Sequence, residues 1–177
     1  QSQIDQLGWT ATHRRYPALE ATTQEARALG LRHAGELGLW RTTKNILNEW
    51  LASDPTDDDV LHILEDDAIL NAALPKLIKP LLSCTPNIDL LFTESFLNLE
   101  KYHHFQQLEN RRQHSKAWLI FLSGRHYLAC TSSYLITKQG ARKIIHMIKE
   151  KEAKGILRPI DILSLIHISE PTRPERI

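Results

Sequence analysis

An apolar segment enclosed by acidic residues constrains the fold of this chain more than any other feature. Residues 60–64 read Val-Leu-His-Ile-Leu and lie between three aspartates at 57–59 and three carboxylates at 65–67. A nearly continuous run of branched apolar residues with charge on both sides is typical of a strand that is buried on both faces. We therefore expect this strand at the centre of a sheet that helices cover.

Segments with helical spacing of apolar residues alternate with short apolar segments that are typical of strands. The helical segments are residues 20–29, 36–52, 72–82 and 139–151. The strand segments are residues 60–64, 88–92, 117–122 and 127–136. This alternation predicts an α/β fold with a mostly parallel central sheet. Such sheets bind ligands at the carboxyl ends of their strands, which directs attention to the residues after Leu64.

Composition narrows the classes of function. The chain has 177 residues, with 22 Lys and Arg against 21 Asp and Glu, so its formal net charge is +1. A dedicated nucleic-acid binder normally has a marked basic excess, so no nucleic-acid partner is expected. Cys84 and Cys130 are too few for a disulfide framework, and they lack the clustered partners of a zinc site. No apolar run approaches the roughly 18–20 residues that span a bilayer.

The acidic triplet (Glu65, Asp66 and Asp67) directly follows the predicted buried strand. Adjacent carboxylates repel one another unless water screens them or a cation balances their charge. If the chain stays extended, the side chains of Glu65 and Asp67 point to one side and that of Asp66 to the other. Two carboxylates on one side suit Mg²⁺ or Mn²⁺, which commonly complete their shell with water and substrate phosphates. The triplet is therefore a candidate metal–phosphate site.

Two other interpretations of the acidic triplet remain open. It can be a solvated strand end, or a helix start at which Asp66 or Asp67 caps backbone amides. It can also close a calcium loop, because four residues with oxygen ligands match the first, third, fifth and twelfth positions of an EF-hand. These residues are Asp54, Thr56, Asp58 and Glu65. Against this, the sixth position is Asp59 rather than glycine, and residues 60–64 are predicted to be a strand.

Some residues whose chemistry suits ligands also have plainer explanations. His62, inside the predicted strand, is expected to be a hydrogen-bonded histidine of the core. Trp40 and Trp50 lie on the apolar stripe of a predicted helix and are expected in the core. Arg14 and Arg15 suit contacts with phosphates, and a solvated position is the alternative.

Four sequence blocks, in order, resemble glycosyltransferase family 25, the lipopolysaccharide-type glycosyltransferases with a GT-A fold. They are Gly35-Glu36-Leu37-Gly38, residues 60–67 (VLHILEDD), residues 131–136 (TSSYLI) with Gly140 and Ala141, and Pro159-Ile160-Asp161. The resemblance covers about residues 8–163. The chain departs from the family at Leu39, where cysteine is usual, and at Thr42 and Thr43, where Ser-His is usual.

The resemblance implies a GT-A-like nucleotide-sugar-binding domain that is truncated at its N-terminus. It implies transfer of a hexose, galactose or glucose, from a UDP-sugar to a saccharide or lipid-linked acceptor. The setting would be the synthesis of lipopolysaccharide or another cell-surface polysaccharide. The transfer is expected to be inverting and assisted by Mn²⁺ or Mg²⁺, with Glu65 and Asp67 as the metal ligands.

The resemblance also suggests roles for single residues. Asp161 is expected to be the base that deprotonates the acceptor hydroxyl, or a ligand of the donor, and capping of the next turn is the alternative. Asp66 is expected to assist in binding the nucleotide ribose or the metal, and Ser133 and Tyr134 are expected to line the donor or the acceptor site. For Tyr134 the alternative is packing on the sheet.

An enzyme of this kind is expected in the cytoplasm, at the inner face of the membrane, without a transmembrane segment. A local basic stretch suits peripheral contact with anionic lipid or with an acidic saccharide, and a solvated loop is the alternative. Its residues are His103, His104, Arg111, Arg112 and His114.

The two ends of the sequence shape the expected domain organisation. Residues 1–163 are expected to form a partial glycosyltransferase domain, because no family-type first strand precedes Gln6. Residues 164–177 are expected to be a non-native or disordered tail, since residues 165–174 resemble translated sequencing adaptor; a native polar tail is the alternative. The missing first strand, together with the substitution at the Ser-His position, favours a second hypothesis, a catalytically inactive glycosyltransferase-like remnant or fragment.

Overall fold

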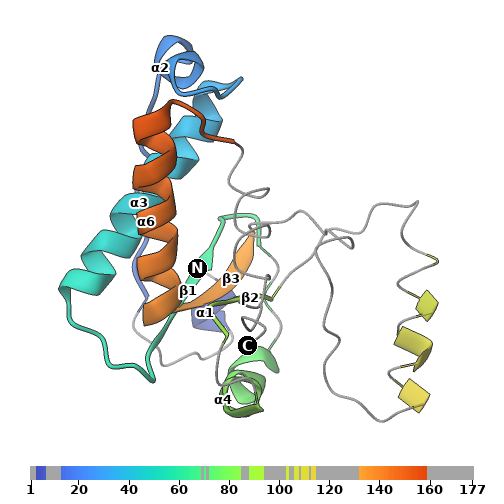
Figure 1. The fold of residues 1–177 in the computed structure, drawn as a ribbon. Coiled ribbons are helices and arrows are strands. Elements are labelled where there is room, and N and C mark those ends of the chain that lie inside the picture. Colours follow the sequence, from blue (N-terminus) through green and yellow to red (C-terminus); the bar gives the residue numbers. More distant parts are fainter. Residues whose placement is uncertain are drawn as a thin grey trace, which may run out of the picture.

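The structure of the chain is a computed structural model. It describes residues 3–6, 13–68, 70, 72–84, 88–93, 103, 106, 107, 109–111, 113, 114 and 132–158. The helices and strands of this part are α1 (Gln3–Gln6), α2 (Thr23–Ala28), α3 (Ala34–Ala52), β1 (Val60–Leu64), α4 (Leu74–Cys84), β2 (Leu90–Phe92), β3 (Ser133–Thr137) and α6 (Lys138–Lys154) (Figure 1). The strand predicted at 117–122, Asp161 and the predicted tail lie outside the described residues.

The described strands form one sheet in the order β1-β3-β2, and both pairings are antiparallel. The predicted α/β character is confirmed, whereas a mostly parallel sheet is not confirmed by these strands. β3 lies between β1 and β2 and runs against both, so β1 and β2 share a direction without pairing with each other. In the described sheet β3 rather than β1 is central, and the residues of β1 are half-buried, so the expected position of residues 60–64 at the centre of the sheet is not confirmed. An apolar run does not show the direction of the neighbouring strand.

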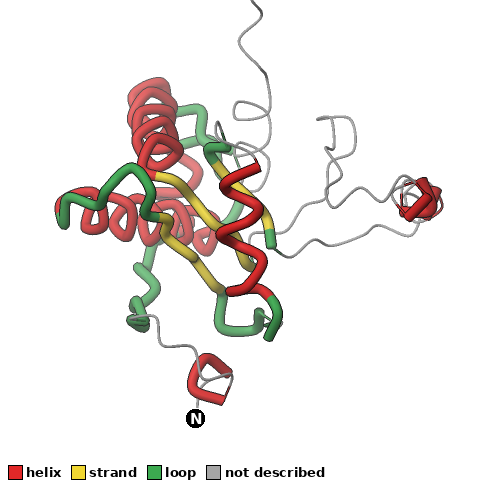
Figure 2. Tube along the Cα trace, turned by 90° about the horizontal axis from the view of Figure 1, so that it is seen from below, coloured by secondary structure: helices red, strands yellow, loops and turns green. Residues whose placement is uncertain are grey.

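α3 and α6 pack side by side against one face of the sheet (Figure 1). α4 lies on the other side of the strands from this pair, which is clearest in the view of Figure 2. None of the described helices is long and apolar enough to cross a bilayer.

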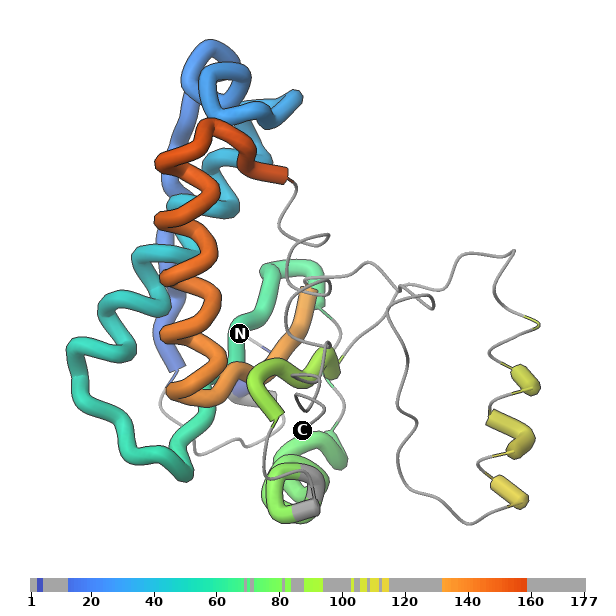
Figure 3. Tube along the Cα trace, in the orientation of Figure 1, coloured from blue at the N-terminus to red at the C-terminus, as the bar shows by residue number. Residues whose placement is uncertain are grey.

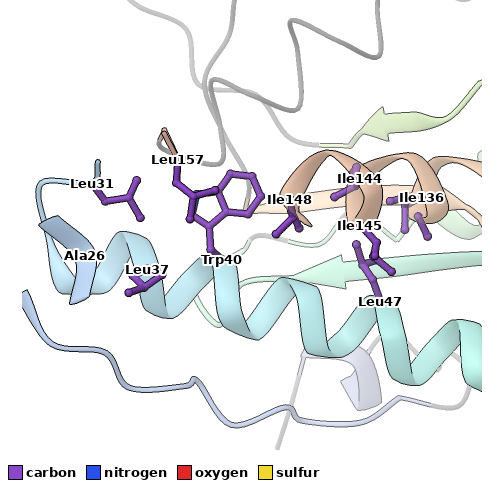
Figure 4. Close-up of a cluster of buried hydrophobic side chains, with 11 residues drawn as sticks. Ala26, Leu31, Leu37, Trp40, Leu47, Ile136, Ile144, Ile145, Ile148 and Leu157 are labelled. Atoms are coloured by element: carbon purple, nitrogen blue, oxygen red, sulfur yellow. The ribbon is translucent and has the colours of Figure 1, made fainter. Parts of the chain in front are cut away.

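The core lies between α3, α6 and the sheet (Figure 4). Its buried members are Ala26, Leu31, Leu37, Trp40, Leu47, Ile136, Ala141, Ile144, Ile145, Ile148 and Leu157. Trp40 is 1% exposed, and its indole N–H donates to the carbonyl oxygen of Arg158 at 2.7 Å. The prediction that Trp40 is a core residue is confirmed, and Trp50 is partly buried against the same cluster.

The glycine- and glutamate-containing block at residues 35–38 has a structural explanation. The Glu36 carboxylate accepts hydrogen bonds from the backbone N–H groups of Arg32, at 2.9 Å, and His33, at 3.3 Å. Together with His33 it forms a capping box that stabilises the first turn of α3. A Cβ atom on Gly38 would lie 2.6 Å from the carbonyl oxygen of Leu19, so glycine is needed where the segment at residues 13–20 passes close to α3.

The segment at residues 13–20 runs along α3 (Figure 3). Besides the close approach at Gly38, the N–H group of Leu19 donates to Thr42 Oγ1 at 2.9 Å. The Arg14 guanidinium pairs with Glu49 at 3.1 Å while its side chain is 71% exposed. Arg14 therefore occupies the solvated position that was the alternative to a phosphate contact.

Candidate functional site

The carboxyl ends of β1 and β2 lie at the same edge of the sheet, because both strands run against β3. The backbone pairing continues one residue beyond each strand. The N–H group of Glu65 donates to the carbonyl oxygen of Ser132 at 2.8 Å, and that of Thr93 donates to Ser133 at 2.9 Å. This edge therefore brings together the start of the acidic triplet, Thr93 and the first residue of β3.

The acidic triplet lies in a turn. The N–H group of Ala68 donates to the carbonyl oxygen of Glu65 at 3.2 Å, and among the described residues after the triplet the next helix is α4, which begins at Leu74. Glu65 is half-buried, whereas Asp66 and Asp67 are exposed. The extended conformation that would place Glu65 and Asp67 on one side is therefore not present. The helix-cap interpretation is also wrong, because a turn rather than a helix follows the triplet.

Gln3 holds the loop that follows the acidic triplet. Its side-chain N–H group donates to the carbonyl oxygen of Ala68, and the N–H group of Leu70 donates to its side-chain oxygen, both at 3.1 Å. Both polar ends of one amide are thus bound to the backbone of the loop. No sequence pattern distinguishes Gln3 from the other polar residues near it, so it was not predicted.

The chemistry of the acidic triplet fits an open metal site. Exposed carboxylate oxygens are the ligands that Mg²⁺ and Mn²⁺ prefer, and such ions commonly take only one or two of them. Within the described residues no three His, Cys, Asp or Glu side chains are grouped as a metal site. A cation at the acidic triplet would therefore have to complete its shell with phosphate oxygens and water.

The calcium-loop interpretation is wrong. Residues 60–64 form β1, and a strand of this length spans roughly 16 Å, so Glu65 is separated from the start of the loop. Asp54 lies 3.5 Å from Lys138 Nζ, and the Asp59 carboxylate accepts hydrogen bonds from Thr56 at 2.7 and 2.9 Å. The aspartates before β1 thus stabilise a turn and the start of α6.

Tyr134 lies beneath the edge, on the face of the sheet that carries the core. It is 6% exposed, and its ring centroid is 6.2 Å from that of Phe92. Burial raises the pKa of Tyr134; a hydrogen bond with Thr43 opposes this effect, and the charge of Glu65 adds to it. Thr43 is itself 4% exposed and stands where the resembled family usually has histidine. Tyr134 is therefore buried, and it is close enough to Glu65 for the charge of that carboxylate to affect its pKa.

Ser133 is the centre of a polar cluster on the opposite face of the sheet. Its Oγ atom lies 2.9 Å from Nε2 of His62 and forms a short hydrogen bond with the hydroxyl of Thr93. Burial lowers the pKa of His62, which favours the neutral imidazole. The prediction that His62 is a hydrogen-bonded histidine is confirmed, although its side chain is only half-buried.

Asp161 and the basic stretch are the remaining predicted site residues, and only part of the basic stretch is described. Asp161 lies outside the described residues, so its role stays a prediction. Of the basic stretch, His103, Arg111 and His114 are described, and all three are exposed. Thr93 was not predicted, although it carries the signal that directed attention to the acidic triplet, a polar residue immediately after an apolar strand.

Comparison with known proteins adds one finding. The family model described as glycosyltransferase family 25 (LPS biosynthesis protein) matches residues 55–163. This range includes β1, the acidic triplet, β2, β3, α6 and Asp161. No curated protein and no solved structure matches the chain.

Proposed function

The chain belongs to glycosyltransferase family 25, and from this premise we propose that it transfers galactose or glucose from a UDP-sugar to a saccharide or lipid-linked acceptor. The acceptor belongs to lipopolysaccharide or another cell-surface polysaccharide under construction, at the cytoplasmic face of the membrane. The observation that carries the proposal is the position of the acidic triplet. It lies inside the matched range and directly after β1, at the end of the sheet where β1 and β2, which share a direction, both finish.

In this proposal Glu65 and Asp67 hold Mn²⁺ or Mg²⁺ beside the diphosphate, and Asp66 contacts the nucleotide. When bound, such a cation neutralises the charge that develops on the diphosphate leaving group. Two sets of hydrogen bonds orient these carboxylates. The backbone N–H group of Glu65 donates to Ser132, and the side chain of Gln3 binds the backbone of the following loop. Without a cation, the same carboxylates would repel the diphosphate.

Asp161 is proposed as the general base of an inverting transfer. It would accept the proton of the acceptor hydroxyl while the hydroxyl oxygen bonds to the anomeric carbon and the bond to the diphosphate oxygen breaks. Inversion requires the base and the leaving group on opposite faces of the hexose. The support for this role of Asp161 is that the residue lies within the range that matches the family.

A GT-A-like sheet is also part of the proposal. β1 and β2 share a direction, which is compatible with a larger mixed sheet in which β3 is the antiparallel member. Strands that pair in parallel on the outer side of β1 or β2 would complete such a sheet.

Calorimetry of UDP binding with and without Mn²⁺ tests the metal site. We expect Asp67→Asn and Glu65→Gln to weaken Mn²⁺-dependent binding by about tenfold or more, since each removes one charged ligand. Asp58→Asn is the matched control, because Asp58 is an exposed aspartate of the neighbouring loop. Binding that needs no metal, or an Asp67→Asn variant that matches the control, would contradict the proposed metal site.

A second candidate is a non-catalytic relative that keeps the fold without turnover. The observation that favours it is Thr43, a buried hydroxyl residue at the position where the family usually has histidine. A transfer assay with UDP-galactose and UDP-glucose separates the two candidates. Metal-dependent UDP binding without transfer or hydrolysis of either donor would favour the non-catalytic relative.

A further inference from the structure

The polar cluster of His62, Ser133 and Thr93 joins the three described strands on the face away from α3. Ser133, from β3, is 3% exposed, and its hydroxyl is hydrogen-bonded to His62 in β1 and to Thr93 after β2. Thr93 Oγ1 also lies 3.5 Å from His62 Nε2. The buried hydroxyl of Ser133 therefore lies at the centre of the cluster, between the half-buried His62 and Thr93.

Thr93 is the member of this cluster that lies at the carboxyl edge of the sheet. It follows the last residue of β2, as Glu65 follows the last residue of β1. The two strands are separated by β3, so these positions lie roughly 10 Å apart by the usual strand spacing. A threonine hydroxyl has one donor and two acceptor sites, more than its contacts to Ser133 and His62 use.

A diphosphate that binds at the acidic triplet and lies across the end of β3 would bring the hexose of the donor toward this hydroxyl. The hexose is bonded directly to the diphosphate, so its own hydroxyls lie about one ring beyond the phosphates. On the β2 side of this edge, among the described residues, the Thr93 hydroxyl is a group that can form a hydrogen bond with the hexose. Hydroxyl groups of this kind are suited to fix the orientation of a sugar through a few placed hydrogen bonds.

We propose that Thr93 binds the hexose of the nucleotide-sugar donor, and that Ser133 and His62 are positioning residues that orient the Thr93 hydroxyl. The assignment rests on the proposed function and adds a sugar-contacting residue to it. The chain of contacts from His62 through Ser133 to Thr93 restrains the Thr93 side chain before the ligand arrives, which lowers the entropic cost of binding.

Calorimetry with the 177-residue chain in the presence of Mn²⁺ tests this role, with UDP, UDP-galactose and UDP-glucose as the probes. Thr93→Val keeps the shape of the side chain and removes the hydroxyl, so we expect the Kd for one or both UDP-sugars to rise about tenfold. The Kd for UDP alone should stay within about twofold, because UDP lacks the hexose. Thr93→Ser restores the hydroxyl and should restore the affinity for the sugar nucleotide.

Three further variants complete the experiment. Ser133→Ala should weaken UDP-sugar binding less than Thr93→Val and leave UDP binding unchanged. Thr23→Val replaces an exposed threonine of α2 and is the control for the substitution itself. Thr93→Ala provides the same comparison if the valine variant does not fold.

Three results would overturn the assignment while leaving the proposed function intact. The first is a Thr93→Val variant that binds UDP-sugars as the unsubstituted chain does. The second is a Thr93→Ser variant that binds UDP-sugars as weakly as Thr93→Val does. The third is an equal loss of affinity for UDP and for UDP-sugars, which would mean that the hydroxyl does not contact the hexose. An unsubstituted chain that binds neither UDP nor UDP-sugars would instead overturn the proposed function and this assignment with it.

Discussion

The carbonyl oxygen of Asp89 lies 2.1 Å from the position that a Cβ atom would occupy on Gly140. The first turn of α6 thus rests directly on the backbone that leads into β2. Two more contacts hold the same place. The N–H group of Thr137 donates to the carbonyl oxygen of Asp89 at 3.1 Å, and Lys143 Nζ lies 2.6 Å from the Asp89 carboxylate. This arrangement places β2 and its following residue, Thr93, relative to β3.

Gly140→Ala should destabilise the protein by about 3 kcal/mol or prevent folding, because the new methyl group would overlap the backbone of Asp89. Urea unfolding followed by circular dichroism measures the change. Gly35→Ala is the matched control, since nothing lies within 4 Å of the Cβ that it would add in α3. The control should be neutral or more stable by up to about 1 kcal/mol, because alanine favours helix. Equal stabilities of the two variants would contradict the close approach.

Gln3→Ala should weaken Mn²⁺-dependent UDP binding several-fold and cost about 1 kcal/mol of stability, since it removes two hydrogen bonds to the loop after the acidic triplet. Calorimetry and urea unfolding measure the two effects. Gln24→Ala, at an exposed position of α2, should change neither quantity. If Gln3→Ala binds UDP as tightly as this control, the loop does not need Gln3 for its binding conformation.

Tyr134→Phe and Thr43→Val should each destabilise the protein by about 1–2 kcal/mol, because each leaves the other buried hydroxyl without its partner. The double variant should be less destabilised than the sum of the two, since no orphaned hydroxyl remains. A double-mutant cycle of unfolding free energies measures this coupling. Strictly additive losses would show that the two hydroxyls do not interact.

The stability of the protein should fall as the pH drops below the ordinary pKa of histidine. Burial lowers the pKa of His62, so the unfolded chain takes up this proton at a higher pH than the folded chain does. The free energy of unfolding should therefore decrease from about pH 7 to about pH 5. His62→Gln should reduce this dependence, whereas His146→Gln, at an exposed site of α6, should not. An unchanged pH profile in His62→Gln would refute the assignment to His62.

The helices and strands were predictable where one periodicity covered many residues. The helix expected at 36–52 is α3 (Ala34–Ala52), and that at 139–151 is α6 (Lys138–Lys154), because each presents a continuous apolar stripe to the core. The strand expected at 60–64 is β1 with the same bounds. The direction of β3 was not predictable, since pairing direction depends on how the chain returns to the sheet and not on which residues are apolar.

The candidate site was predictable only in its position along the chain. An acidic triplet after an apolar strand identified the edge, but the turn that Ala68 closes depends on a backbone hydrogen bond that no side-chain pattern announces. Thr43 and Tyr134 meet across 91 residues (134 − 43), and Gln3 reaches Ala68 from another element. Contacts at such separations follow from the fold, so they emerge only after the elements are packed.

The central position of β3 also sets an order of events during synthesis. In the described sheet, β1 pairs with β3, and β2 also pairs with β3. Residues 133–137, which form β3, follow β2 by about forty positions in the sequence. When the ribosome has made β1, the acidic triplet and β2, the strand that aligns their ends has not yet been made. Closing contacts over so many residues is slow compared with forming helices. The end of the sheet that contains the proposed site should therefore form only after β3 has been made, and a nascent chain halted before residue 133 should carry the acidic triplet without the strand that aligns β1 with β2.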